Sequence, residues 1–257
     1  MLLRNSVKQK LLQGRASIGS WCLTGSPLAA ETLAAAGFEW ILVDIEHFQI
    51  DVAAAANCFR GIQLMGAMPF ARLPACDPIW IKRLLDAGAM GIVIPLIRSA
   101  EDVRNVVQWS RFPPVGRRPY GGGRVHFLYG RDEYIAAANE AILVLVQIET
   151  PEAVDSLDAI LAVDGVDGCF VGPTDLSLSL GMPLPGEPDE KRDKLVASLA
   201  GRIAAAGAIP ATTSASPDQA AERLAQGYRM VSVLADLVFA QSAAVDAAAE
   251  LRRRGLM

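Results

Sequence analysis

The chain has 257 residues, of which 52% are hydrophobic and 20% are charged, and its formal net charge at pH 7 is −4. This composition is typical of a folded protein with a large core. Its longest basic block, Arg252–Arg254, is too small for a nucleic-acid surface. An apolar run of about 18 residues and a signal peptide are both missing, so we predict a cytoplasmic chain that spans no membrane.

No linker rich in Ser, Gly or Pro divides the chain, and its length suits one α/β barrel, so residues 1–257 are predicted to form a single domain. The four cysteines are widely spaced and form no CxxC pair: Cys22, Cys58, Cys76 and Cys169. This spacing favours reduced thiols, and we predict that each packs in the core.

Short runs rich in Val, Ile and Leu alternate along the chain with longer Ala-rich stretches, the pattern of repeated βαβ units. Polar or Pro caps open the stretches between them, and Ala-Gly pairs close several. Eight strands are predicted, at Ser17–Leu23, Trp40–Asp44, Met68–Arg72, Gly91–Pro95, Leu143–Glu149, Gly168–Gly172, Ala208–Thr212 and Met230–Leu234. The number and alternation favour a single (β/α)8 TIM barrel.

One segment interrupts this alternation. Residues 111–131 read RFPPVGRRPYGGGRVHFLYGR and follow the fourth strand and its helix. Long structured loops often bind a ligand, although a cover for the barrel mouth or a contact between subunits would also explain this one. His126 lies in this loop and follows no strand, so we assign it no catalytic role.

In a TIM barrel, catalytic groups lie at the C-terminal ends of the strands. Four predicted strands end in, or are followed by, polar residues, namely Asp44–His47, Arg72, Gln147–Glu149 and Gly172–Asp175. Glu149 and Asp175 end neighbouring strands, so their carboxylates can converge on one point. A hard cation such as Mg²⁺ or Mn²⁺ would relieve their repulsion, whereas the alternative is a pair of ordinary capping or salt-bridged carboxylates.

Two further strand ends carry groups suited to proton transfer and anion binding. His47 stands beside two acids, which would raise its basicity, and is the natural general base. A solvated or packed histidine is the alternative. Arg72 ends an apolar strand, where an unpaired guanidinium would be costly, so we predict that it faces the barrel mouth and meets an anion there, unless it forms a purely structural salt bridge.

The strand ends together resemble the class II pyruvate aldolases of the HpcH/HpaI family. The resemblance covers most of the chain and rests on five segments in the family's order: WILVDIEH, PFARLPACDPIWIKRLLDAGAMGIVIP, RFPPVGRR, LVLVQIET and VDGVDGCFVGPTDLSLSLG. It implies reversible cleavage of a 4-hydroxy-2-oxo acid to pyruvate and an aldehyde through a metal-stabilised enolate. The alternative reactions are metal-dependent decarboxylation of a 2-oxo acid and carbon–carbon bond formation of the macrophomate-synthase type.

The resemblance also implies the roles of the site residues. Glu149 and Asp175 would bind the divalent cation, which is Mg²⁺, Mn²⁺ or Co²⁺. Pyruvate would be held by Gln147, Gly172, Thr174 and Asp175. The catalytic residues would be His47 as base, Asp86 raising its basicity, and Arg72 stabilising the enolate. No Schiff-base lysine is required, and no predicted strand ends in one.

Two features near the C-terminus concern specificity and assembly. The seventh strand ends in hydroxyl-bearing residues at 212–214, where the family tends to be aliphatic, and we predict a preference for a polar, hydroxylated aldehyde. The final helix, residues 236–254, has an apolar face that packs either on its own barrel or on another subunit. The resemblance implies a homo-oligomer, and often a hexamer whose subunits exchange their C-terminal helices.

Overall fold

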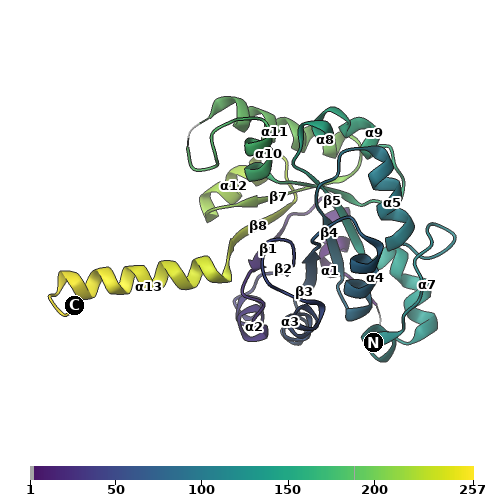
Figure 1. Cartoon of the computed structure of the whole chain (residues 1–257), viewed down its shortest axis with the longest axis horizontal. Helices are drawn as coiled ribbons and strands as arrows, with labels where there is room; N and C mark the ends of the chain where they lie inside the picture. Colours follow the sequence, from purple (N-terminus) through teal and green to yellow (C-terminus); the bar gives the residue numbers. More distant parts are fainter. Residues whose placement is uncertain (1–2, 188) are drawn as a thin grey trace.

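Eight parallel strands close into a barrel in which each strand pairs with the next one along the chain and β8 pairs with β1. The computed structural model describes residues 3–187 and 189–257. Helices surround the barrel on its outside (Figure 1). The predicted (β/α)8 TIM barrel is therefore confirmed.

The strands agree with the predicted segments to within two residues at each end. They run β1 Ser17–Cys22, β2 Trp40–Asp44, β3 Met68–Arg72, β4 Gly91–Ile94, β5 Leu143–Ile148, β6 Gly168–Val171, β7 Ile209–Ser214 and β8 Met230–Ala235. The largest difference is in β7, which continues through Ser214 instead of ending at Thr212. Thr213 therefore lies within the strand, on the opposite face from its neighbour Thr212.

The helices begin where the sequence supplies capping groups. The Ser26, Asp77, Thr150 and Ser216 side chains each accept a hydrogen bond from a backbone N–H in the first turn of a helix that also starts with proline. The helices are α1 Ser6–Leu12, α2 Pro27–Ala35, α3 Val52–Leu64, α4 Pro78–Ala87, α5 Ala100–Ser110, α6 Gly123–Tyr129, α7 Arg131–Ala141, α8 Pro151–Asp155, α9 Leu157–Leu161, α10 Pro173–Ser179, α11 Glu190–Ala205, α12 Pro217–Ala225 and α13 Asp236–Arg253.

The barrel interior is filled by side chains, which leaves its chemistry to the rim. Trp40 of β2 stacks on Phe70 of β3 with ring centroids 5.7 Å apart, and both are buried. A side chain on Gly19 of β1 would overlap the Trp40 ring, since its Cβ would lie 2.1 Å from a ring carbon. Because all strands run parallel, their C-terminal ends share one rim, where polar groups of distant segments meet.

The segment 111–131 is held against the barrel by two buried arginines. The guanidinium of Arg111 donates to the Asp167 carboxylate at 2.8 Å and to three backbone carbonyls. Arg118 pairs with Asp86 at 2.8 Å and lies over the Phe112 ring. The second half of the segment forms α6 and was not predicted as a helix. Its start at Gly122 has no side-chain cap, so the sequence lacked the usual signal.

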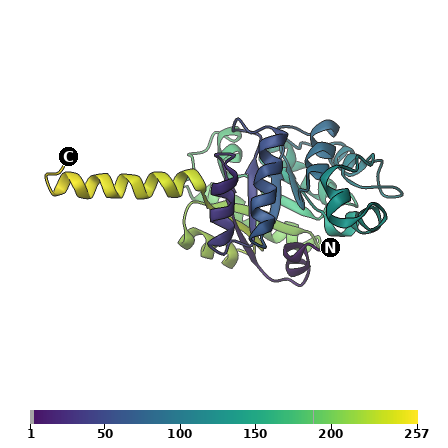
Figure 2. The same ribbon diagram turned by 90° about the horizontal axis from the view of Figure 1, so that it is seen from below.

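The last helix, α13, projects away from the barrel (Figures 1 and 2). Its first turns contact the barrel, where Phe239 lies 6.2 Å from Phe38 between ring centroids. Beyond Phe239 nearly every residue of the helix is exposed, Val245 and Leu251 included. Packing on its own barrel is thus limited to the start of the helix. Within the described residues, no helix is both long enough and apolar enough to cross a membrane.

The cysteine prediction holds for three residues and is wrong for the fourth. Cys22, Cys58 and Cys169 are buried, and none of the four is in a disulfide. Cys76 is exposed, because it lies in the loop between β3 and α4 rather than in a strand or on the inner face of a helix.

Candidate active site

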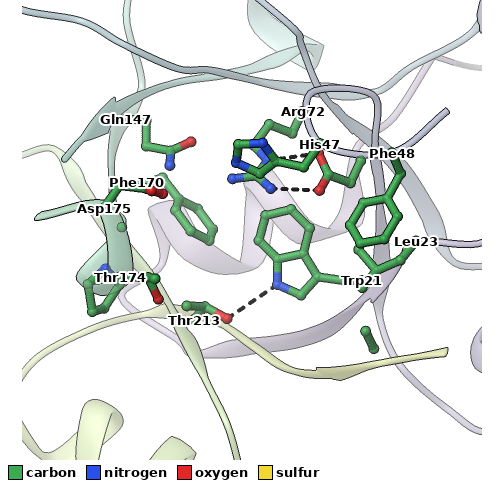
Figure 3. Close-up of a pocket in the computed structure, with 14 residues that line it drawn as sticks. Trp21, Leu23, His47, Phe48, Arg72, Gln147, Phe170, Thr174, Asp175 and Thr213 are labelled. Carbon is green, nitrogen blue, oxygen red and sulfur yellow. Dashed lines mark hydrogen bonds and ion pairs between the residues drawn. The ribbon is translucent and has the colours of Figure 1, made fainter. Parts of the chain in front are cut away.

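A cavity of about 310 Å³ opens at the C-terminal ends of the strands (Figure 3). Its wall contains residues of β1, β2, β3, β5, β6, β7 and β8 or of the loops that follow them. Six of the residues predicted for the site line it: His47, Arg72, Gln147, Gly172, Thr174 and Asp175. The barrel thus brings together segments that are far apart in sequence, such as Trp21 of β1 and Ala235 of β8.

Arg72 is fixed at the edge of this cavity by a buried carboxylate. Its Nε and Nη2 donate to the two carboxylate oxygens of Asp44 at 3.0 and 2.6 Å, and its guanidinium carbon lies 4.6 Å from the centre of the Trp21 ring. Because Asp44 ends β2 opposite Arg72 at the end of β3, the strand register creates this pair. These hydrogen bonds use Nε and Nη2, which leaves Nη1 available for a ligand oxygen. Arg72 is therefore both salt-bridged and a lining residue of the mouth.

Glu149 follows the last residue of β5, lies against the cavity-lining Gly172 and is only 3% exposed. Its Oε1 accepts a hydrogen bond from the Leu96 N–H at 2.8 Å, and its Oε2 accepts one from the amide of Gln147. Gly172 makes this arrangement possible, because a Cβ there would lie 2.9 Å from Gln147 Nε2 and 3.2 Å from Glu149 Oε2. Burial raises the pKa of Glu149, and the charge of Asp175 raises it further.

The donors around Glu149 and Asp175 fit a hard divalent cation. Both are carboxylates; Asp175 lines the cavity, and Glu149 Oε2 lies against Gly172, another lining residue. The buried Gln147 Oε1 has no hydrogen-bond partner in the described part of the chain. Within residues 3–187 and 189–257, no three His, Cys, Asp or Glu side chains are grouped as metal ligands. A cation held by these two carboxylates would have its remaining positions open to water or substrate oxygens.

Glu46 was not assigned a role from the sequence, yet it joins the two functional side chains at the mouth. Its Oε2 lies 3.3 Å from Arg72 Nε and 3.8 Å from His47 Nε2. This oxygen is buried but accepts no hydrogen bond from any described residue. The sequence places two acids, Asp44 and Glu46, near His47, but only the loop conformation shows that Glu46 lies beside the imidazole.

The structure does not bring Asp86 to His47 within one chain, contrary to the expectation from the resemblance. Asp86 lies near the C-terminal end of α4, and α4 runs back toward the N-terminal ends of the strands. Its carboxylate accepts a hydrogen bond from Arg118 at 2.8 Å. In the single chain, the carboxylate beside His47 is that of Glu46.

One wall of the cavity carries a chain of hydroxyl groups. Trp21 Nε1 donates to Ser232 Oγ at 2.7 Å, and Ser232 Oγ donates to Thr213 Oγ1 at 2.9 Å. Thr213 lines the cavity, and because its oxygen already accepts from Ser232, its own hydrogen is available to a ligand. Thr212 has a different role, since its hydroxyl is buried and donates to the Val171 carbonyl at 3.0 Å.

The ionisation of Glu46 gives a prediction for stability against pH. Burial raises its pKa to about 7 from its usual 4.5, against the opposing charge of Arg72. The ionised carboxylate thus costs more in the folded than in the unfolded chain, so stability is highest below pH 4.5 for this group and falls as the pH rises to 7. Glu46→Gln is expected to flatten this fall, measured by thermal unfolding in EDTA between pH 5 and 8.

The matched control for this experiment is Glu101→Gln, an exposed glutamate on α5 whose substitution should leave the slope unchanged. A wild-type slope that persists in Glu46→Gln would show that another group titrates in this range.

The barrel and its polar rim define a class of protein. A closed (β/α)8 barrel with an arginine, a histidine and buried carboxylates around one cavity at the C-terminal ends of its strands has the design of a TIM-barrel enzyme. The sequence matches the family model described as HpcH/HpaI aldolase/citrate lyase over residues 17–243. The chain therefore belongs to this family.

Individual relatives agree with this assignment. The chain is 39% identical over 245 residues to 2-keto-3-deoxy-L-rhamnonate aldolase of Klebsiella pneumoniae subsp. pneumoniae, covering 91% of this chain and 88% of the relative. A family protein from Burkholderia cenocepacia J2315 has 34% identity and a TM-score of 0.89, covering 96% of this chain and 99% of the other. The citrate synthase SbnG has 28% identity and a TM-score of 0.86, covering 97% and 98%. The relatives support the predicted class of carbon–carbon lyase.

Proposed function

We propose that this chain is a metal-dependent pyruvate aldolase that cleaves a 4-hydroxy-2-oxo acid to pyruvate and an aldehyde. The single observation that carries the proposal is the grouping of His47, Arg72 and Asp175 around one cavity, with the buried Glu149 against its Gly172 wall. Such a set contains a base, a cation to hold an oxyanion, and oxygen ligands for a metal. The aldolase relatives support the same reaction.

Cleavage requires that a proton leave the C4 hydroxyl while the bond between C3 and C4 breaks. His47 accepts this proton, the C4 oxygen becomes the aldehyde carbonyl, and the electrons of the broken bond form the pyruvate enolate. Arg72 is held by Asp44 with Nη1 free, so it can stabilise the enolate oxygen. A divalent cation held by Glu149 and Asp175, such as Mg²⁺, Mn²⁺ or Co²⁺, would polarise the 2-oxo group. Protonation of C3 then gives pyruvate.

Pyruvate itself would be held on the side of the cavity formed after β5 and β6. The Gln147 amide and the first turn of α10, with Thr174 and Asp175, line this side. The backbone N–H groups of that turn are suited to a carboxylate, because the start of a helix favours negative charge. Gly172 keeps the backbone close to Gln147, so a side chain there would obstruct the bound acid.

The aldehyde portion would lie toward the wall formed by Trp21 and Thr213. The available Thr213 hydrogen favours an aldehyde that carries its own hydroxyl group, as a 2-keto-3-deoxy sugar acid would release. The name of the 39% identical relative, a 2-keto-3-deoxy-L-rhamnonate aldolase, agrees with this substrate class.

Replacing this hydroxyl is expected to change specificity. Thr213→Val keeps the shape but removes the donor, and should lower kcat/KM for a hydroxylated aldehyde by roughly tenfold relative to an unsubstituted aldehyde of equal length. The measurement is aldol addition of pyruvate to the two aldehydes in competition. Thr212→Val, which changes a hydroxyl bonded to the backbone, is the control and should leave the ratio unaltered. An unchanged ratio in Thr213→Val would count against this role.

The activity itself is tested by pyruvate release from racemic 4-hydroxy-2-oxo acids, coupled to lactate dehydrogenase. Cleavage should stop in EDTA and return with Mg²⁺, Mn²⁺ or Co²⁺. Cleavage that persists unchanged in EDTA would remove the metal from the proposal. Absence of pyruvate with every metal, together with decarboxylation of oxaloacetate, would replace the aldolase by a 2-oxo acid decarboxylase.

We further propose that the chain assembles into a homo-oligomer through α13. The projecting helix leaves Leu237, Val238, Val245 and Leu251 exposed, more apolar surface than a free helix of a monomer needs. An apolar cavity lies beside its first turns against α2, with Leu33 and Phe38 in its wall. Light scattering should give a multiple of the 27.3 kDa chain mass, and a hexamer with exchanged helices is the expected form.

A further inference from the structure

A second cavity, of about 490 Å³, lies at the end of the barrel opposite the candidate active site. It opens beside Met68, the first residue of β3, and Met90, which directly precedes β4. The active-site cavity is instead lined by Arg72, the last residue of β3. The two cavities are therefore separate sites at opposite ends of the barrel.

The wall of this second cavity is strongly basic. Arg4, Arg60 and Arg124 line it, and no aspartate or glutamate does. None of these three arginines is in an ion pair with a described residue, whereas Arg72, Arg111 and Arg118 each pair with a buried or half-buried aspartate. Arg4 and Arg60 are exposed and Arg124 is half-buried, and Arg60 donates only to the Asn57 side chain. With no carboxylate among the described lining residues, the combined charge of these arginines favours an external anion.

Arg124, from the segment 111–131, is held in position toward the cavity. Its Nη1 lies against the backbone at Gly88, where a Cβ would come within 2.4 Å of that nitrogen. Burial lowers the pKa of Arg124 and the charge of Arg60 lowers it further, with only Tyr129 opposing. Both guanidinium groups line the same cavity, so an anion bound between them would interact with two positive charges.

Tyr129 supplies a second, independent indication of a ligand. Its side chain lines the cavity and is only 8% exposed. The phenol oxygen accepts a hydrogen bond from Gln63 Nε2 at 3.3 Å, but the acceptor for its own hydrogen is the sulfur of Met90 at 3.8 Å. A thioether is a weak acceptor, so this buried donor would gain a stronger partner from a ligand oxygen.

We propose that this cavity binds a small organic dianion, whose two negative charges are carried on oxygen atoms, between the guanidinium groups of Arg60 and Arg124. Guanidinium forks match both carboxylate and phosphate oxygens, so a phosphate monoester and a dicarboxylate share the required chemistry. The leucine and methionine side chains that complete the wall suit the carbon portion of such a ligand. The proposal is independent of the aldolase reaction, because it involves none of the active-site residues.

The test is isothermal titration calorimetry of the full chain with inorganic phosphate and, separately, with succinate, in EDTA at constant ionic strength. At least one of the two should bind with Kd below about 1 mM. Arg60→Gln and Arg124→Gln should each weaken binding by roughly tenfold or more, because each removes a charged donor. Tyr129→Phe should weaken it by a smaller factor. Arg83→Gln, an exposed arginine of α4 outside the cavity, is the matched control and should bind as the wild type does.

Which arm binds distinguishes a phosphate site from a dicarboxylate site. Arg72→Lys distinguishes anion binding in the active-site cavity from binding in the second cavity. It alters only the active-site guanidinium, so binding of the dianion in the second cavity should be unchanged. Loss of binding in Arg72→Lys but not in Arg60→Gln and Arg124→Gln would place the anion in the active site and overturn the proposal. No binding of either anion would also overturn the proposal. A changed oligomeric mass in Arg124→Gln would then assign the arginines to a subunit contact.

Discussion

His47→Gln is expected to lower kcat for pyruvate release by about 10²- to 10⁴-fold, because glutamine keeps a polar side chain at the mouth but cannot accept the proton of the C4 hydroxyl. His47 lines the cavity and its side chain is half exposed, so the fold should not depend on it. KM should change little, because the imidazole transfers a proton in the chemical step and is not proposed to bind the substrate. The measurement is steady-state cleavage at saturating metal, with thermal unfolding as a check on folding.

The control for this experiment is the other histidine of the chain. His126→Gln alters an exposed imidazole that contacts Tyr120 on the segment 111–131 and lies outside the cavity, so kcat should be unchanged. Equal losses in both variants would point to a general effect on folding. A His47→Gln enzyme with wild-type kcat would remove His47 as the base and leave Glu46, its nearest carboxylate, as the group to test next.

Glu149→Gln is expected to lower cleavage by roughly a thousandfold or more, because it removes one of the two charged ligands proposed for the cation, whose charge stabilisation is worth several kcal/mol. The same change should stabilise the protein in EDTA. Burial raises the pKa of Glu149, so its ionised form destabilises the folded chain at neutral pH, and the neutral amide removes this cost. Thermal unfolding with and without Mn²⁺ measures both effects.

Two outcomes separate metal binding from a structural role. In the wild type, Mn²⁺ should raise the midpoint of thermal unfolding, and in Glu149→Gln this increase should be lost. Glu152→Gln, an exposed glutamate in the first turn of α8, should behave as the wild type does. A Glu149→Gln protein that keeps both the Mn²⁺ response and its activity would show that Glu149 is not a metal ligand.

Much of the fold was predictable because its signals are local. The runs that form β2 and β3 were predicted to the residue, since each is apolar throughout and ends at a charged side chain. Where a strand continues into hydroxyl-bearing residues, as β7 does through Ser214, the apolar pattern ends before the backbone pairing does. Helix α6 was not predicted because its start at Gly122 lacks a capping side chain, so no local signal marks it.

The candidate site was predictable to the extent that the barrel rule applies. Polar residues at the ends of parallel strands must share one rim, which brings Arg72, Gln147 and Asp175 into one cavity. Distances across that rim depend on side-chain directions, which the rule does not give. Glu46 was therefore overlooked although it lies between Arg72 and His47, and Asp86 was expected beside an imidazole that it does not reach within the chain.

The sequence by itself determined the class of fold, the family, and which residue types stand at the strand ends, because these depend on periodicity and on motifs that are continuous in the chain. Only the tertiary structure decided the partners: Asp44 for Arg72, Glu46 for His47, and Ser232 for Thr213. It also decided that three arginines from separate segments border a cavity without a carboxylate. Strand register brings Asp44 to Arg72 and Ser232 to Thr213, whereas the conformation of the loop after β2 places Glu46 beside His47.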